Sequence, residues 1–399
     1  METRRRARGT LLAVGVVALG LLAVPTLADH TVGVTPDSIK IGFFGALTGP
    51  YYLYGKLVMN GADAVYNEVN RAGGIHGRKI VTVREDDRCD AATAIAAVKK
   101  LVHQHQVFMI HGGGCSNPTI AARDEIEKSR TPFIVFAAVA DRITMPLAPY
   151  IFSSALTART ESFVQVDFAL SKPDVKRIAI VSQHDAWGIS RYEPLKEALK
   201  KKGITPVADE EMTVDANDGT AQVLRILAAK PDAVMMELYP KPGAIFLRDA
   251  HKLGLKVLFV GQTAISDLAE FEKLVGIPGA TESFYSISQV ALTPEDPKVA
   301  KWAEILKRDF PEDRLSIYTL FGIASAQVVV EALKRTGKDL TREGLKAALE
   351  KMCGRFTELY AGDVCWSPED HQGNKYGAWI RFERGKVVNI GAKWVPPTK

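Results

Sequence analysis

Short patterns that could carry catalysis or nucleotide binding are either absent from this sequence or fail a test of spacing or residue type. A phosphate-binding loop needs G-x4-G-K-[ST] after a strand, because backbone N–H groups surround the phosphates and the hydroxyl binds Mg²⁺. Residues 49–57 (GPYYLYGKL) have one residue too many and Leu57 in place of that hydroxyl. Neither a G-x-S-x-G nucleophile elbow nor a G-x-G-x-x-G loop after a strand occurs.

Adjacent carboxylates form a further pattern, at Asp86-Asp87 and Glu210-Glu211. Neighbours on a strand point to opposite faces, so neither pair makes an acid–base pair. We expect both pairs to be solvated strand ends. The sequence therefore contains no signature of an enzyme.

The number and spacing of the cysteines and histidines bear on disulfide formation and metal binding. The four cysteines are Cys89, Cys115, Cys353 and Cys365. An even number suggests disulfides in an oxidising compartment, and of the three possible pairings 89–115 with 353–365 is the most local. The chain has no CxxC, and His103, His105 and His111 have no partners at zinc-finger spacing. We therefore expect no metal and no cofactor.

The first 28 residues differ from the rest of the chain. Arginines at 4, 5, 6 and 8 precede an apolar run from Leu11 to Val24, and small residues follow at 25–28. This order predicts a secretory signal peptide, since the apolar run is shorter than the roughly 20 residues of a membrane span. Cleavage of this segment would remove four Arg and one Glu, so the net charge of the chain would fall from +5 to +2. The remaining mixed charge gives no reason to expect nucleic acid or a membrane surface as partner.

Short apolar runs alternate with helical patterns, first over residues 39–136 and again over 177–260. Strands are predicted at 39–44, 79–83, 107–110 and 133–136, with helices at 56–70, 91–104 and 118–128 between them. Such alternation predicts parallel sheets with helices on both faces, here in two similar α/β lobes. The remaining elements have no sheet of their own and must complete these lobes. They are helices predicted at 297–310, 318–335 and 342–351 and a hairpin at 378–390.

Several ordered motifs resemble a known family. They are the opening strand and loop at 39–50 (IKIGFFGALTGP), the helix and turn at 60–62 and 70–79, the strand end at 86–90 (DDRCD) and the loop at 112–117 (GGGCSN). In this order they resemble the type I periplasmic binding proteins of the branched-chain amino acid (Leu/Ile/Val-binding) group of ABC transporters. The resemblance runs from about Ser38 to the C-terminus.

The resemblance implies an α/β fold of two Rossmann-like lobes joined by three crossover strands. The expected division is a signal peptide at 1–28, an N-terminal lobe at 36–156 plus 287–360, and a C-terminal lobe at 157–286 plus 361–399. Crossings are expected near 155–158, 284–288 and 358–368. The family also places a disulfide between Cys89 and Cys115, whereas Cys353–Cys365 rests on proximity. The expected protein is a periplasmic monomer that binds a small molecule and delivers it to permease and ATPase subunits.

Carried over by position, the family's ligand contacts fall first on the N-terminal lobe. Ser116 and Asn117 occupy the loop that supplies a hydroxyl and N–H groups to a carboxylate, although either could instead cap the following helix. The next loop, 136–140, puts Val139 where a hydroxyl is usual, so only backbone contact remains. Ala137 is a further candidate in this loop and Phe136 a weaker one. Tyr54 matches an aromatic of the first loop, and Tyr51 lies beside it.

On the C-terminal lobe the family's aromatic before a glycine matches Trp187, and its ligand tyrosine matches Tyr239. Core packing is the alternative for the first, an ordinary interface tyrosine for the second. His184 is a weaker candidate. Thr263 departs from the family, because amino-acid binders place an acid there to pair with the α-ammonium group, and a buried cation needs a paired charge.

The predicted ligand is an aromatic carboxylate, such as a benzoate. This prediction rests on Thr263, on the apolar segment 136–139 and on the aromatic side chains of Tyr54, Trp187 and Tyr239. Branched-chain amino acids and small amides remain alternatives. The rival functional classes are a secreted enzyme and an extracellular ligand-sensing receptor. An enzyme would need catalytic residues, and none were found. A receptor of this kind would need a membrane segment, which we do not expect after removal of the signal peptide.

Overall fold

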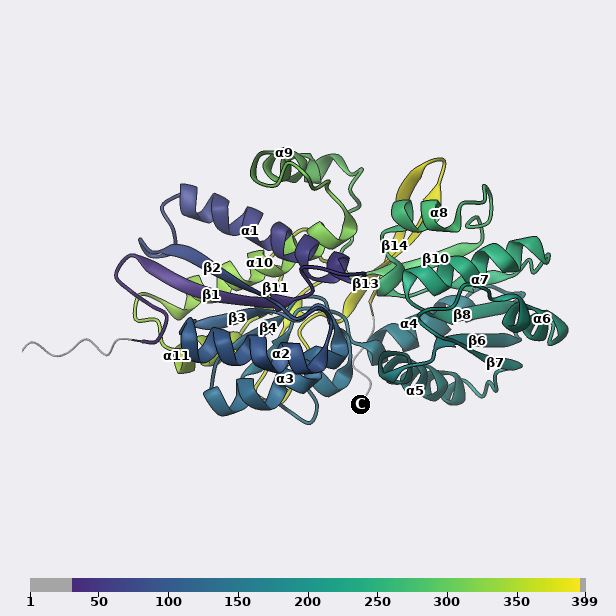
Figure 1. Cartoon of the computed structure of the whole chain (residues 1–399), viewed down its shortest axis with the longest axis horizontal. Coiled ribbons are helices and arrows are strands. Elements are labelled where there is room, and N and C mark those ends of the chain that lie inside the picture. The colour runs from purple at the N-terminus through teal and green to yellow at the C-terminus, as the bar shows by residue number, and fades with distance from the viewer. Residues whose placement is uncertain (1–30, 395–399) are drawn as a thin grey trace, which may run out of the picture. The chain divides into compact units, whose positions relative to one another are not determined.

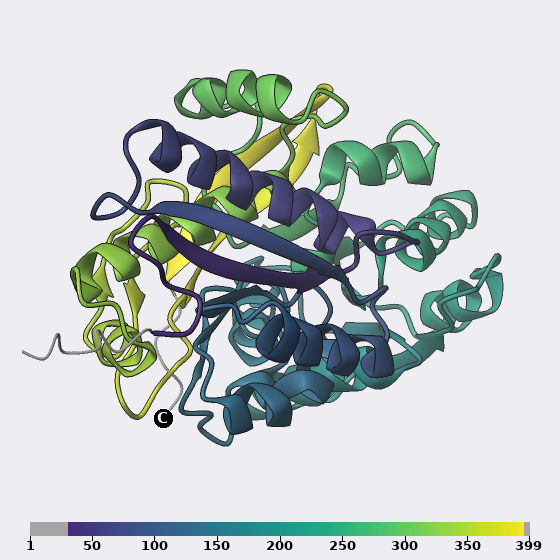
Figure 2. The same cartoon turned by 60° about the vertical axis from the view of Figure 1, so that its left-hand side comes forward.

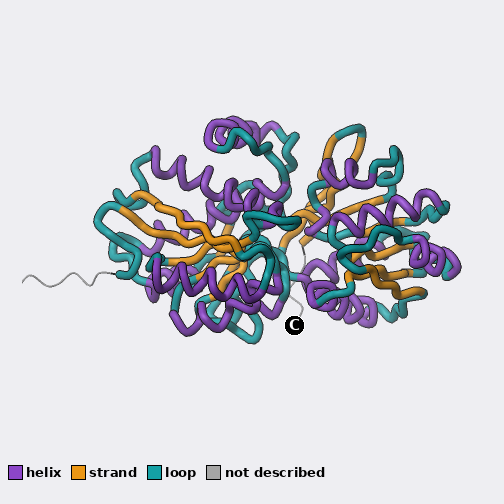
Figure 3. Tube along the Cα trace, in the orientation of Figure 1, coloured by secondary structure: helices purple, strands orange, loops and turns teal. Residues whose placement is uncertain are grey.

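Two large β-sheets carry the fold of residues 31–394, the part of the chain that the computed structural model describes. The predicted signal peptide at 1–28 lies outside the described residues. The strands of both sheets have helices packed around them (Figure 3). The chain is therefore a mixed α/β protein, which confirms the predicted fold class.

The first sheet is parallel throughout, in the order β2-β1-β3-β4-β5. Its strands are β1 (Ser38–Gly45), β2 (Lys79–Asp86), β3 (Met109–Gly112), β4 (Phe133–Val135) and β5 (Ile151–Ser153). The helices beside it are α1 (Lys56–Arg71), α2 (Ala91–Lys99), α3 (Ser116–Ser129), α9 (Ala300–Asp309), α10 (Ile317–Thr336) and α11 (Arg342–Leu349). Helices α1, α9, α10 and α11 pack into one core and α2 with α3 into another, so both faces are covered (Figures 1 and 2).

The second sheet has the order β14-β13-β10-β9-β8-β6-β7. Its parallel strands are β6 (Ile178–Gln183), β7 (Ala208–Met212), β8 (Ala233–Glu237), β9 (Leu258–Val260) and β10 (Phe284–Ser288). The antiparallel hairpin β13 (Tyr376–Glu383) and β14 (Lys386–Trp394) completes it. Helices α6 (Thr220–Ala228), α7 (Pro240–Lys252) and α8 (Leu268–Val275) share one core with it, and α4 (Ala158–Leu170) and α5 (Ala186–Lys201) another.

The chain passes three times between the elements of the two sheets. The passages follow β5 at 154–157, β10 from Gln289 onward, and the short hairpin β11 (Cys353–Gly354) and β12 (Val364–Cys365) at 366–375. Gln289 links two of them, since its side chain accepts from the Leu156 N–H and donates to the Phe136 carbonyl. The third passage comes later than the expected 358–368 because Val364 and Trp366 pack in the core of the first sheet. The exact lobe boundaries stay a prediction.

Helix α10 lies along α1, and glycines bring the two backbones together. A Cβ at Gly61 would lie 2.0 Å from the Thr319 carbonyl oxygen, and one at Gly322 would lie 1.8 Å from that of Val58. Of the described helices, α10 alone is long and apolar enough to cross a membrane, but 83% of its apolar window is buried inside the protein. We interpret it as a core helix.

Both expected disulfides are present, Cys89–Cys115 and Cys353–Cys365. The first ties the turn after β2 to the start of α3. The adjacent pair Asp86-Asp87 corrects the expectation of a solvated strand end. Asp86 accepts hydrogen bonds from the Leu47 N–H and the Thr48 hydroxyl, and Asp87 is fully buried. The pair therefore anchors loops at the strand ends.

Candidate ligand-binding site

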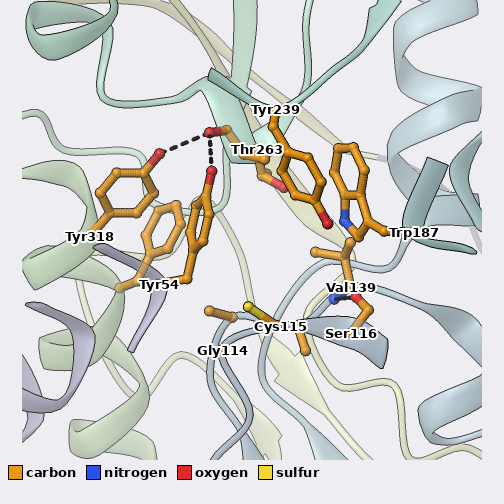
Figure 4. A pocket seen from close by; sticks show the side chains of 13 residues that line it. Tyr54, Gly114, Cys115, Ser116, Val139, Trp187, Tyr239, Thr263 and Tyr318 are labelled. Carbon is orange, nitrogen blue, oxygen red and sulfur yellow. Dashed lines mark hydrogen bonds between the residues drawn. The ribbon is translucent and has the colours of Figure 1, made fainter. Parts of the chain in front are cut away.

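A pocket lies at the carboxyl ends of strands from both sheets, the edge at which ligands of parallel α/β sheets bind. Loops after β3 and β4 of the first sheet and after β6, β8 and β9 of the second contribute to it. The lining residues are Tyr54, Gly114, Cys115, Ser116, Ala137, Ala138, Val139, Trp187, Tyr239, Thr263, Ala264, Tyr318 and Phe321 (Figure 4). The cavity has a volume of about 30 Å³, which is room for only a few water molecules. A larger ligand therefore enters only when the walls move apart.

Ser116 offers a hydrogen-bond donor to this pocket. Its Oγ accepts from the N–H groups of Val139 and Ala140 at 3.2 and 3.3 Å, so the hydroxyl proton is left to donate elsewhere. Ser116 is the first residue of α3. The N-cap residue of this helix is Cys115, and its side chain makes no capping hydrogen bond. The start of a helix favours negative charge, so this corner suits an anionic oxygen.

One wall of the pocket is aromatic. The rings of Trp187 and Tyr239 are stacked with centroids 4.1 Å apart, and Tyr51 packs on Tyr239 at 5.3 Å from outside the lining. Trp187 lies in the first turn of α5, where Asp185 caps the helix by accepting from the Gly188 N–H. None of the lining side chains is acidic or basic. The pocket interior is thus apolar and aromatic with a few neutral polar groups.

Behind Thr263 lies a fully buried network of charged side chains. The Thr263 hydroxyl donates to Oε1 of Glu161 at 2.6 Å, and its backbone N–H donates to Oε2 at 3.1 Å. Arg191 joins Glu161 Oε2 at 2.8 Å to Glu237 Oε2 at 2.5 Å. Gln165 donates to the other oxygen of Glu237. Thr263 therefore stands between the pocket and a cluster of two acids and one base.

Opposing effects act on the ionisation of this cluster. The net effect raises the pKa of Glu161, because burial outweighs Arg191 and the Thr263 hydrogen bonds, which lower it. The two carboxylates raise the pKa of the Arg191 guanidinium against the lowering effect of its burial. Both oxygens of Glu161 accept hydrogen bonds, the pattern of an ionised carboxylate. We therefore treat Glu161 as charged.

Two tyrosine hydroxyls meet on one carbonyl at the pocket wall. Tyr54 and Tyr318 donate to the Ala264 carbonyl oxygen at 3.0 and 2.8 Å, drawn as dashed lines in Figure 4. Tyr54 follows β1 and Tyr318 is the second residue of α10, whereas Ala264 follows β9 of the second sheet. These bonds hold the first-sheet side of the pocket against the second-sheet side.

The pocket brings together seven of the residues expected from the sequence. They are Tyr54, Ser116, Ala137, Val139, Trp187, Tyr239 and Thr263. Asn117, Phe136, Tyr51 and His184 are not among the lining residues. Phe136 is buried against His111, and the exposed His184 pairs with Glu211. Ligand contact by any of these residues stays a prediction.

Sequence reasoning missed Tyr318, Phe321, Glu161 and Arg191, and it considered Glu237 only as a substitute, like Asp267, for the acid missing at Thr263. The two aromatic residues stand three apart in a predicted helix, so they share one face and could have been read as a pocket wall. No comparable signal joins Glu161, Arg191 and Glu237, which come from α4, α5 and β8.

Comparison with known proteins places the chain in a family. A family model described as "Periplasmic binding protein" matches residues 38–386. The chain belongs to this family, and to its type I members of the branched-chain amino acid group. Such proteins are solute-binding components of ABC transporters rather than enzymes; they bind a small ligand in the periplasm and work with permease and ATPase subunits.

Individual relatives and solved structures differ in their ligands. The Leu/Ile/Val-binding protein BraC3 of Rhizobium johnstonii is 25% identical over 350 residues, 88% of this chain and 93% of that protein. The substrate-binding protein LivJ of Streptococcus pneumoniae, solved with isoleucine, has a TM-score of 0.77 at 23% identity and covers 90% of this chain and 100% of its own. A solute-binding protein of R. palustris, solved with 4-hydroxybenzoate, has a TM-score of 0.78 at 20% identity. The match covers 90% of this chain and 98% of that protein. At these identities the two structures support the fold alone.

Proposed function

We propose that this solute-binding protein captures an aromatic carboxylate. The observation that carries the proposal is the stacked pair Trp187 and Tyr239 in a pocket whose lining has no charged side chain. Aromatic pairs contribute about 0.5–1.5 kcal/mol beyond the burial of their area, so a ligand ring gains from this wall. A solved protein of the same fold holds 4-hydroxybenzoate, which makes the ligand class compatible with the architecture.

The carboxylate would bind at Ser116 and the start of α3. The Ser116 proton is available because its lone pairs already accept from Val139 and Ala140. Apolar side chains of Ala137, Ala138 and Val139 would then contact the ring. Closure of the walls would exclude water and strengthen the few polar contacts.

A branched-chain amino acid is the second candidate, favoured by the buried acids behind Thr263. Glu161, Glu237 and Arg191 together carry a net negative charge when ionised, which would attract an ammonium group. However, both oxygens of Glu161 are already engaged by Thr263 and Arg191. An ammonium group would therefore face only the neutral Thr263.

Titration calorimetry on the mature protein tests the proposal. The ligands are benzoate, 4-hydroxybenzoate and cinnamate against leucine, isoleucine and valine, with acetamide for the small amides. We expect micromolar or tighter binding of at least one aromatic acid and none of the amino acids. Tight binding of leucine or valine without any binding of the aromatic acids would overturn the proposal.

Export and oligomeric state are further proposals. We expect residues 1–28 to be removed as a signal peptide and the mature chain to be monomeric. Mass spectrometry of the periplasmic protein, followed by light scattering, tests both; an uncleaved N-terminus or a dimeric mass would contradict them.

A further inference from the structure

The Thr263 hydroxyl would offer a bound ligand only one kind of hydrogen-bonding capacity. A hydroxyl has one proton to donate and lone pairs with which to accept. The proton goes to Glu161 Oε1 at 2.6 Å, and Thr263 also lines the pocket. Only lone pairs remain for a ligand, so Thr263 acts there as an acceptor.

Glu161 is held so that this orientation persists. Its Oε2 accepts from both the Thr263 N–H and Arg191 Nη2, and Oε1 is left for the Thr263 hydroxyl. Arg191 is in turn held by Glu237, and Gln165 donates to Glu237. These four side chains are fully buried, so water does not compete for their hydrogen bonds.

We propose that Glu161 is a specificity-determining positioning residue that makes Thr263 select a ligand bearing a hydrogen-bond donor opposite Ser116. Ser116 presents a donor and Thr263 an acceptor, so the site has a fixed polarity. Combined with the aromatic carboxylate proposed above, on which this inference rests, it predicts a ring whose carboxylate meets Ser116 and whose hydroxyl or amino group meets Thr263. Unsubstituted or methylated rings would leave the Thr263 acceptor without a partner.

Glu161→Gln reverses this polarity without changing the size of any side chain. Two donors, the Thr263 N–H and Arg191, converge on the Oε2 position, so the amide oxygen must occupy it. The amide N–H₂ then faces the Thr263 hydroxyl and donates to it. The hydroxyl proton turns into the pocket, where it repels a ligand donor.

Matched probe ligands measure the effect. 4-Aminobenzoate and 4-methylbenzoate have nearly the same shape, but only the first offers an N–H donor; the 3-substituted pair covers the other ring position. In the wild-type protein we expect the amino compound to bind about 10-fold more tightly than the methyl compound. In Glu161→Gln this preference should fall at least 5-fold, to near unity or below.

Two further variants separate the hydrogen bond from other causes. Glu237→Gln removes the same charge from the network but leaves an amide oxygen to accept from Arg191 and leaves both Glu161 oxygens in place, so the wild-type ratio should persist. Thr263→Val removes the acceptor and should abolish the preference, which keeps the test decisive if Glu161→Gln fails to fold by circular dichroism. A wild-type ratio in Glu161→Gln and Thr263→Val, or an equal fall in Glu237→Gln, would overturn the inference.

An incorrect ligand class can be told apart from an incorrect role of Glu161. If the wild type binds none of these benzoates and none of the aromatic acids of the calorimetric test above, the proposed function is overturned. The variants are then compared with leucine and 4-methyl-2-oxopentanoate, whose ammonium and keto groups differ in the same donor capacity. A Glu161→Gln protein that keeps the wild-type preference for leucine would overturn the inference on its own.

Discussion

Trp187 and Tyr239 form a stacked pair, with ring planes only 18° apart and centroids separated by 4.1 Å. The guanidinium of Arg191, one helical turn after Trp187, lies 5.4 Å from the centre of the indole. The charged network thus supports the aromatic wall as well as Thr263. This arrangement couples the shape of the pocket to buried electrostatics.

Replacing Trp187 by Ala should weaken binding of an aromatic acid by about 1–3 kcal/mol, because ring stacking and buried area are lost. Calorimetry with 4-hydroxybenzoate measures the change. Trp302→Ala is the control, since Trp302 is similarly buried but lies in α9 outside the pocket lining. Equal affinities of wild type and Trp187→Ala would contradict a role for the indole in ligand binding.

Arg191→Met should lower the free energy of unfolding by about 3–5 kcal/mol, because Glu161 and Glu237 would remain buried without their counter-charge. Urea denaturation at pH 7.5 measures this. In Arg225→Met, which breaks an ion pair whose arginine is exposed, the loss should stay within about 1 kcal/mol. Similar losses in the two variants would mean that the buried network contributes no more than a surface pair.

Removing both tyrosine hydroxyls from Ala264 should favour separation of the pocket walls. Each bond contributes about 0.5–1.5 kcal/mol, so the double variant Tyr54→Phe, Tyr318→Phe should weaken ligand binding about 5- to 150-fold. X-ray scattering of the liganded protein should also give a larger radius of gyration than for the wild type. Tyr192→Phe, which loses a hydroxyl contact to Asp209 away from the pocket, should behave as the wild type. An unchanged affinity and radius in the double variant would contradict a closing role.

Asp87 should make stability depend on pH. Burial raises its pKa from 3.8 to about 6, with smaller contributions from Asp86 and Asp90, while a hydrogen bond from the Cys89 N–H acts against the shift. A raised carboxyl pKa means that the folded state binds the proton more tightly than the unfolded state. The stabilising contribution is complete below pH 3.8 and is lost as the pH rises through about 6.

Asp87→Asn tests this effect. Relative to the wild type, its free energy of unfolding should rise by up to about 3 kcal/mol between pH 4 and pH 7.5, because the wild type must bury a charge at the higher pH. Denaturant titrations at the two pH values measure the difference. Parallel pH dependences of the two proteins would contradict the assignment.

The alternation of short β-branched runs with amphipathic helices was enough to predict the α/β fold, because parallel strands buried on both faces must be continuously apolar. The run Ile39–Phe44 became β1, and the helix expected at 318–335 became α10. Local motifs also carried the family assignment and the residues at strand ends, including Ser116 and Trp187. These features depend on neighbours in sequence, so they can be read from it.

The function of Thr263 depends on contacts that only tertiary structure creates. From the sequence, Thr263 was the residue where an expected acid was missing. In the fold, Glu161 reaches it from another helix, 102 residues away, and takes its proton. Arg191 and Glu237 meet Glu161 because α4, α5 and β8 pack together, and no local pattern records that proximity. Polarity of the site is therefore a property of the packed network, whereas the positions of its lining loops were already determined by the order of strands and helices along the chain.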